Sequence, residues 1–383
     1  MRVAVVGPGI SDRWDEAQLT ARRVAGALAH HGRVTILVPG TAPRMWSEGL
    51  FDIHQHASVP GNPHRAFMLE HALHGGTGGR RAEFVPPTRR RLEEELFLAR
   101  GEYAPGMVEE LTREAFDVVV FAGVTGHTAF CSRSLPERSA AFLAAVPQDR
   151  RPLHLGLVTD ACARADAILV TTEVERELLC SALPSMASRV RPIGFIVRTN
   201  ELAAQARPNA FPDRAPVVVV ADWDDVSDRD EWVRWATMIE NDLDGAVQLR
   251  ALGPGANRVA PPLAGESGPS RIDLWRWTSH ALAAVDPLGY ANISVPSLEA
   301  LCYGTPLIAP ASGGAARHHA EVGNCGLWYR SYDEFRGCVE LLLGDDDLRS
   351  SLARNGRHYV DSSFGDTDLF VKGVLEATQL PAA

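Results

Sequence analysis

The stretch YANISVPSLEALCYGTPLIAPASGG covers residues 290–314 and holds three elements in close succession. SVPSLEALCY has the spacing of a helix, and Pro296 stands in its first turn, where no intrahelical N–H donor is needed. PLIAP is a short apolar run typical of a buried strand, and Gly313 and Gly314 then let the backbone approach a ligand closely. The stretch therefore predicts a helix, a strand and a turn, with one carboxylate, Glu299, a turn inside the helix.

Short apolar runs alternate with amphipathic helical stretches on both sides of this stretch. VAVVG, VTILVP, FDVVVFAG and ADAILVTT are predicted strands of the first half, and VVVVADW, VQLRAL, ALAAVDP and GLWY are those of the second. Apolar runs without strict alternation suit parallel strands that helices cover on both faces. We predict an α/β fold of two doubly wound, Rossmann-like domains, whose ligands bind at the carboxyl ends of the strands.

The domain boundaries follow from a proline-containing stretch that separates the two series of predicted strands and helices. We predict an N-terminal domain over residues 1–200, a proline-containing linker over 201–215 and a C-terminal domain over 216–362. Residues 47–88 carry five histidines and many glycines, and we interpret them as a long mobile loop. The spacing of His54 and His56 would suit a metal, but a solvated loop fits the glycine and arginine content better, so we predict no metal site.

Composition excludes several classes of protein. The 383 residues carry a net charge of −10, which argues against a nucleic-acid partner. Six cysteines lie without C-x-x-C pairs, as expected for free thiols in a reducing compartment. No apolar run approaches the roughly 20 residues of a membrane span, and MRVAVVGPG has the pattern of a strand and turn rather than a signal segment. We expect a cytoplasmic protein.

The segment 287–329 resembles the donor site of retaining GT-B glycosyltransferases of the family 4 type. The residues that carry the resemblance at the family's spacing are Pro287, Glu299, Ala300, Gly304, Pro306, Gly313, Gly314 and Gly326. LLLGDDDLRSSLARNGRHYVDSSF, FDVVVFAGV and ADAILVTTEVERELL also resemble parts of the family. The resemblance implies a GT-B fold, with two Rossmann-like domains facing each other across a cleft. It also implies a last helix, over 363–383, that crosses back to the N-terminal domain.

The resemblance assigns a donor site to the C-terminal domain. Glu299 takes the family role of binding the ribose, and a carboxylate one turn into a helix can accept paired hydrogen bonds from two ribose hydroxyls. Ser294, Val295 and Pro296 form the start of that helix, whose N–H groups suit a diphosphate. The Gly313–Gly314 turn completes the site.

Several positions depart from the family pattern. Ala291 stands where the family has the glutamate that contacts the donor sugar, and Asp222 and Ser227 replace the arginine and lysine that hold the diphosphate. A charge-assisted hydrogen bond to phosphate contributes roughly 1.5–3 kcal/mol, so other cations are needed. The candidates on predicted loops are Arg229, Arg258, Arg271 and Arg317, the last at the position of a family glutamate.

The acceptor side of the resemblance lies in the first domain. Its candidate residues there are Gly9 in the first glycine turn, Asp15 and Glu16 at the family's Gly-Gly, and Gln148, Asp149 and Arg150 near the family's histidine. The run WRW at 275–277 is interpreted as core packing with one exposed ring rather than as a stacking platform.

The resemblance implies a metal-independent glycosyltransferase that transfers a sugar with retention from a nucleotide-diphosphate donor. The acceptor would be a small molecule or glycan of a natural-product or polysaccharide pathway, and the nucleotide sugar is a co-substrate, with no cofactor. The departures leave an alternative open, namely a catalytically degenerate GT-B protein that serves as a partner or regulatory subunit. Both hypotheses are compatible with a homo-oligomer or a complex with a partner enzyme.

Overall fold

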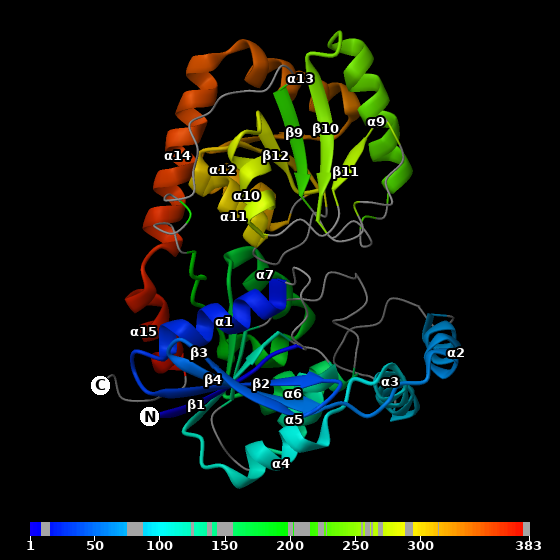
Figure 1. The fold of residues 1–383 in the computed structure, drawn as a ribbon, viewed down its shortest axis with the longest axis vertical. Helices are drawn as coiled ribbons and strands as arrows, with labels where there is room; N and C mark the ends of the chain where they lie inside the picture. The colour runs from blue at the N-terminus through cyan, green and yellow to red at the C-terminus, as the bar shows by residue number, and fades with distance from the viewer. Residues whose placement is uncertain are drawn as a thin grey trace. The chain divides into compact units, whose positions relative to one another are not determined.

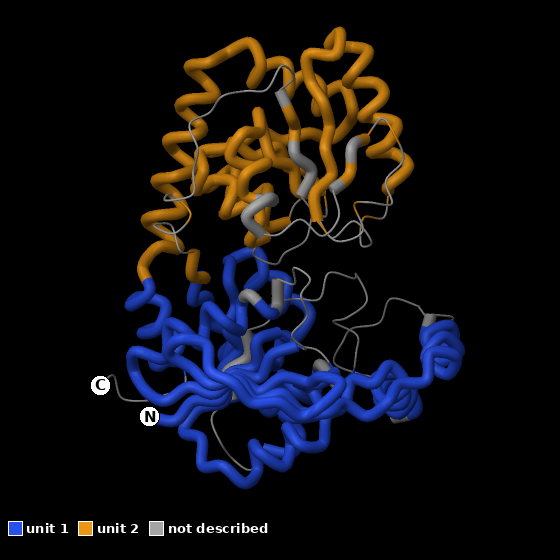
Figure 2. The backbone as a smooth tube through the Cα atoms, viewed as in Figure 1, with its two compact units in different colours: residues 1–11, 15–194, 367–383 blue, residues 12–14, 195–366 orange. Residues whose placement is uncertain are grey.

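The structure of the chain is a computed structural model. It describes residues 1–8, 16–74, 87–123, 126–135, 140–143, 156–197, 202, 215–220, 226, 228–253, 256, 261, 263–266, 271–287, 294–312 and 314–377. The chain divides into two compact units (Figure 2). The first unit comprises residues 1–11, 15–194 and 367–383, and the second comprises residues 12–14 and 195–366.

The first unit is built on a largely parallel sheet (Figure 1). Its described strands are β1 (Arg2–Val6), β2 (Arg33–Gly40), β3 (Arg44–Glu48), β4 (Phe51–Ala57), β5 (Val118–Ala122), β6 (Ala140–Leu143), β7 (Ala167–Val170) and β8 (Val190–Pro192). They lie in the order β3-β4-β2-β1-β5-β6-β7-β8, and only β3 pairs antiparallel to its neighbour. β5 is buried throughout, because helices cover both faces of a doubly wound sheet.

Helices connect these strands. Those described are α1 (Glu16–Leu28), α2 (Pro63–His74), α3 (Pro87–Arg100), α4 (Pro105–Arg113), α5 (Gly126–Arg133), α6 (Gly156–Arg164), α7 (Glu173–Ala182), the short 3-10 helix η2 (Pro184–Arg189) and α15 (Thr367–Ala377). α15 comes last in the chain and packs against α1 and β7. Its buried residues Phe370, Val371 and Val374 therefore join the core of the first unit.

Residues 47–74 correct one prediction. We expected a long irregular loop over 47–88, but β3, β4 and α2 occupy most of the first part of it, while residues 75–86 lie outside the described residues. Gly49, with a φ of 61°, closes the turn between β3 and β4. β4 pairs in parallel with β2 and buries Ile53 completely. Its two histidines, whose spacing would suit a metal, face the buried carboxylate of Glu110 on α4.

The second unit is a parallel sheet of Rossmann order. Its described strands are β9 (Ala215–Val220), β10 (Val247–Leu252), β11 (Ala264–Glu266), β12 (Ala283–Val285), β13 (Leu307–Pro310) and β14 (Gly326–Tyr329). They lie in the order β11-β10-β9-β12-β13-β14 with every pair parallel. The helices are α9 (Arg229–Asp242), α10 (Arg271–Ser279), α11 (Val295–Tyr303), α12 (Ala315–Val322), α13 (Tyr332–Gly344) and α14 (Asp346–Phe364). The prediction of two doubly wound parallel-sheet domains is confirmed.

An aromatic cluster forms part of the core of the second unit. Trp232 and Trp235 of α9 meet Tyr329 at the end of β14 and Phe335 of α13, with ring centroids 5.0–6.4 Å apart. Phe335 is fully buried among the other three rings. The cluster ties α9 and α13 to the edge strand of the sheet.

No helix in the described part of the chain is both long enough and apolar enough to cross a bilayer.

Candidate functional site

The strand order of the second unit marks a place for a ligand. Numbered along the unit, the strands run third, second, first, fourth, fifth, sixth, so the direction of winding reverses between β9 and β12. In open α/β sheets, ligands bind at the carboxyl ends of the strands beside this reversal. β12 leads there to the N-terminus of α11, and β9 leads to that of α9. The start of α11, within the segment singled out in the sequence, therefore lies at the expected edge.

The start of α11 has an unusual backbone. Ser294 stands at the N-cap with a φ of 48° and a ψ of 70°, in the left-handed region. Within the described residues its hydroxyl donates to Ser297 Oγ at 2.7 Å rather than capping a backbone N–H. Val295 is buried, and Pro296 takes the second helical position. These residues hold the first turn in place and leave its N–H groups without the usual serine cap.

Glu299 lies one turn inside α11 and is only 2% exposed. Its Oε2 accepts a 3.1 Å hydrogen bond from the indole N–H of Trp275 on α10, the helix that precedes β12. The pairing corrects our interpretation of residues 275–277, because Trp275 and Trp277 are both half-buried and each has a polar neighbour. A buried carboxylate needs such donors, since an unpaired buried charge is costly.

The C-terminal end of α11 is fixed by α14. Gly304 follows the helix with a φ of 79°, a conformation that favours glycine. Arg357 of α14 donates to the carbonyl of Tyr303 at 3.1 Å and occupies the space that a side chain at position 304 would need. α11 is thus held at its far end while its N-terminus faces the carboxyl edge of the sheet.

The next helix at the same edge is α12. Gly314 is its N-cap and has a φ of 91°, so this one of the two predicted glycines lies directly before a helix N-terminus. Gly313 lies outside the described residues. His319, fully buried on α12, bonds through Nδ1 to the hydroxyl of Tyr359 at 2.9 Å and anchors the helix to α14.

The candidate arginines are not equivalent. The guanidinium of Arg317 lies 4.0 Å from the ring centre of Trp328 and 3.3 Å from the carboxylate of Glu321, so it is engaged within its own unit. Arg229 is exposed at the first position of α9, and its Nε donates to the carbonyl of Val226 at 3.1 Å. Arg271 begins α10, but its side chain is outside the described part of the chain.

Several predicted positions cannot be placed. The described residues do not include the candidate cation Arg258. They also do not include Asp222, Ser227 and Ala291, the positions that differ from the family's donor site. Among the acceptor-side residues they leave out Gly9, Asp15, Gln148, Asp149 and Arg150, and Glu16 is described only as the first residue of α1. Their roles stay predictions.

In the first unit, carboxylates occupy two helix N-termini at the carboxyl edge of the sheet. Glu102 accepts from the backbone N–H of Gly126, the first residue of α5, at 3.1 Å. Glu93, fully buried on α3, accepts from the N–H of Gly156, the first residue of α6. Burial raises the pKa of Glu102, although Arg100 and the Gly126 N–H act against it. Negative charge is stabilised at such termini, and here the chain itself supplies it.

His127 follows Gly126 in the first turn of α5. Burial lowers the pKa of His127 to about 4, so its ring is neutral at pH 7. Within the described residues its buried Nδ1 has no hydrogen-bond partner. Sequence analysis did not single out Glu93, Glu102 or His127, because their contacts join elements that are distant in the chain.

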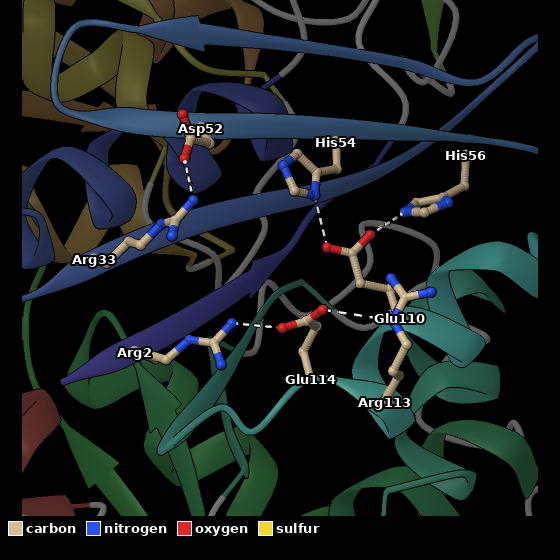
Figure 3. A network of polar contacts seen from close by, with 8 residues as sticks. All are labelled: Arg2, Arg33, Asp52, His54, His56, Glu110, Arg113 and Glu114. Carbon is tan, nitrogen blue, oxygen red and sulfur yellow. Dashed lines mark hydrogen bonds and ion pairs between the residues drawn. The ribbon is translucent and has the colours of Figure 1, made fainter.

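A second polar cluster lies on β4 and α4 (Figure 3). His54 Nδ1 and His56 Nε2 each bond one oxygen of Glu110, at 2.6 and 2.9 Å. Residues 54 and 56 alternate onto the same face of β4, which explains why both rings reach one carboxylate. No group of three or more ligand side chains that could hold a metal was found among the described residues. The pair of histidines thus holds α4 to the sheet.

We predict that Glu110→Gln lowers the free energy of unfolding by about 1–3 kcal/mol at pH 7, because buried bonds to a charged acceptor are lost. Burial raises the pKa of Glu110, but the bonds from His56 and His54 outweigh it and bring that pKa below the ordinary 4.5. A lowered pKa stabilises the fold above about pH 4.5, and this contribution is lost as the pH falls through the folded-state value. Urea unfolding at pH 7 and pH 4 should therefore show a difference between variant and wild type that shrinks in acid.

The neighbouring Glu109 is exposed on the same helix and provides the control for this prediction. Glu109→Gln should change stability by less than about 0.5 kcal/mol at either pH. A Glu110→Gln effect that is equal at pH 7 and pH 4 would contradict an ionic role for the carboxylate.

Comparisons with known proteins bear on the fold. No family model matches the sequence, and no curated protein matches it either. Among solved structures, the sucrose-phosphate synthase of Thermosynechococcus elongatus aligns with a TM-score of 0.68 and 15% identity over 99% of this chain and 98% of its own.

Two further solved structures align over 100% of both chains. A trehalose-6-phosphate synthase described in work on glycosyltransfer with retention has a TM-score of 0.71 and 13% identity. A structure described as trehalose-6-phosphate from E. coli bound with UDP-2-fluoro glucose has a TM-score of 0.68 and 13% identity. At these identities the likeness establishes the fold alone, and the chain has the GT-B fold of two Rossmann-like domains.

Proposed function

We propose that the protein is a glycosyltransferase that moves a sugar from a nucleotide-diphosphate donor to an acceptor. The observation that carries this proposal is the place of Glu299, a buried carboxylate one turn inside the helix that follows β12, where the strand order reverses. The likeness of the whole chain to sugar-phosphate synthases supports the reaction class. The UDP-2-fluoro glucose bound to one of them supports a uridine nucleotide as the first donor to test.

The donor would lie along the carboxyl edge of the second unit. The two ribose hydroxyls would donate to Glu299, and the diphosphate would accept from the N–H groups at the start of α11, where the helix dipole favours negative charge. Gly314 gives the backbone before α12 the same freedom to approach the phosphates. Arg229 is the described candidate cation best placed to help, because it follows β9, the other strand at the reversal.

The protein would orient the two substrates and would supply no nucleophile of its own. The bond between the sugar C1 and the β-phosphate oxygen breaks, the acceptor oxygen bonds to C1, and the acceptor proton passes to the leaving phosphate. Preorganised donors that stabilise the departing charge supply the rate. Retention of configuration and independence from metals are proposed because the family that residues 287–329 resemble has both properties.

The N-termini of α5 and α6 in the first unit do not suit a phosphate group of the acceptor. Glu102 and Glu93 already place carboxylates on the first N–H groups of these helices, so an anion there would meet like charge. We therefore propose a neutral or cationic acceptor, in the wider class of small molecules and glycans.

A catalytically degenerate GT-B protein is the second candidate. Asp222 and Ser227 stand where the family has the arginine and lysine that hold the diphosphate. Arg317, a candidate to replace them, contacts Trp328 and Glu321 instead, and this observation favours the second candidate. Such a protein would act as a partner or regulatory subunit of another enzyme.

Titration calorimetry with UDP, GDP, ADP and TDP, in EDTA, separates the two candidates. We expect micromolar binding of one nucleotide, and release of that nucleotide from its sugar conjugate in the presence of an acceptor mixture. Failure of the folded protein to bind any of the four at millimolar concentration would overturn the glycosyltransferase and leave the partner role.

A further inference from the structure

Trp275 and Glu299 meet between two helices that flank β12. They are 24 positions apart, and the indole N–H of Trp275 donates to Glu299 Oε2 at 3.1 Å. α10 and α11 pack against each other, which brings the indole to the buried carboxylate. The contact therefore depends on the packing of two elements rather than on a local turn.

The chemistry of this pair is directional. The terminal torsion of a glutamate is broad, so an isolated carboxylate rotates between many orientations. An indole N–H only donates, and it matches a carboxylate without competing for the hydroxyl donors of a sugar. A carboxylate offers about four acceptor positions, of which the indole uses one. The bond restricts rotation of the carboxylate plane, and with it the directions in which the other oxygen can accept hydrogen bonds.

We propose that Trp275 is the positioning residue of the nucleotide site. Its N–H fixes the carboxylate of Glu299 in the orientation that receives both ribose hydroxyls, and so sets the preference for ribonucleotides over 2′-deoxyribonucleotides. The proposal rests on the proposed function, because it requires a nucleotide at Glu299. Trp275 itself touches the carboxylate and not the ribose.

The chain contains a matched control two residues further on. Trp277 lies on the same helix and is likewise half-buried, but its ring lies 3.8 Å from the guanidinium carbon of Arg250. Trp277→Phe makes the same chemical change as Trp275→Phe without touching the indole bond to Glu299.

The experiment measures the dissociation constants of UDP and 2′-deoxy-UDP for the wild type, Trp275→Phe and Trp277→Phe, with thermal melting to verify folding. In the wild type we expect UDP to bind about 10-fold or more tighter than 2′-deoxy-UDP, the effect of a hydrogen bond to a charged group. In Trp275→Phe the ratio should fall below about 3-fold through weaker UDP binding, while Trp277→Phe keeps the wild-type ratio. General loosening of the unit would weaken both nucleotides equally.

Each outcome decides one point. An unchanged ratio in Trp275→Phe, or equal weakening of both nucleotides, overturns the positioning role and leaves the proposed function intact. If the wild type binds GDP or ADP instead of UDP, the ratio for that base and its 2′-deoxy form decides the positioning role by the same criterion. Binding of TDP alone, which lacks the 2′-hydroxyl, overturns the positioning role, and absence of all binding overturns both proposals. If Trp275→Phe fails to fold, β-(3-benzothienyl)alanine at position 275 keeps the ring size, lacks the N–H and gives the same ratio test.

Discussion

Replacing Glu299 with glutamine is expected to weaken nucleotide binding by about 10- to 100-fold, because the two ribose hydroxyls lose a charged acceptor. Glutamine has nearly the same shape, and its amide oxygen can still accept from the Trp275 indole at the place where Oε2 now does. The melting temperature should therefore move little. Calorimetric titration of the bound nucleotide measures the affinity, and thermal melting of the same samples measures the stability.

Alanine at position 299 is a less informative change. It would leave the half-buried indole N–H without the Glu299 acceptor and empty a buried volume, so affinity and stability would fall together. Glutamine separates the two effects.

Glu340→Gln serves as the control for Glu299→Gln. Glu340 is exposed on α13 of the same unit, where it pairs with Arg336 at 3.4 Å, and its replacement should leave the dissociation constant unchanged. If Glu299→Gln bound the nucleotide as well as the wild type does, the ribose would have to be held elsewhere. The assignment of the donor site to α11 would then be wrong.

The backbone around this site could be predicted because its signals are local. An apolar run with Pro296 in its first turn and Gly304 at its end specifies α11, and Gly314 marks the start of α12. The partner of Glu299 could not be predicted, because Trp275 reaches it only through the packing of α10 on α11. Periodicity tells which face of each helix is apolar, but it does not pair residues across two helices.

The first unit shows the same limit in another form. The apolar runs of β1, β2, β5 and β7 predicted strands because central parallel strands are buried on both faces. β3 and β4 were missed because an edge hairpin is partly exposed and polar. FDIHQHA looked like loop, although its alternation places Ile53 on one face and two histidines on the other.

Phe335→Ala is expected to lower the free energy of unfolding of the second unit by about 3–5 kcal/mol. The ring is fully buried, with centroids of Trp232, Trp235 and Tyr329 at 5.7, 5.2 and 5.4 Å. Its removal deletes the apolar contact and leaves a cavity that three large rings cannot easily fill. Urea unfolding followed by tryptophan fluorescence measures the loss, since Trp232 and Trp235 report from the cluster itself.

Leu341, 52% exposed on the same helix, is the matched control, and Leu341→Ala should lower the free energy of unfolding by less than about 1 kcal/mol.

A bound nucleotide stabilises the native state by mass action, so the unfolding transition that the nucleotide shifts is the one to assign to the second unit. Folded Phe335→Ala should keep the nucleotide affinity of the wild type, because the cluster lies in the core and not at the start of α11. Glu299→Gln is expected to do the reverse, losing affinity and keeping stability. A Phe335→Ala protein that was as stable as Leu341→Ala would mean that the cluster does not hold α9 and α13 together.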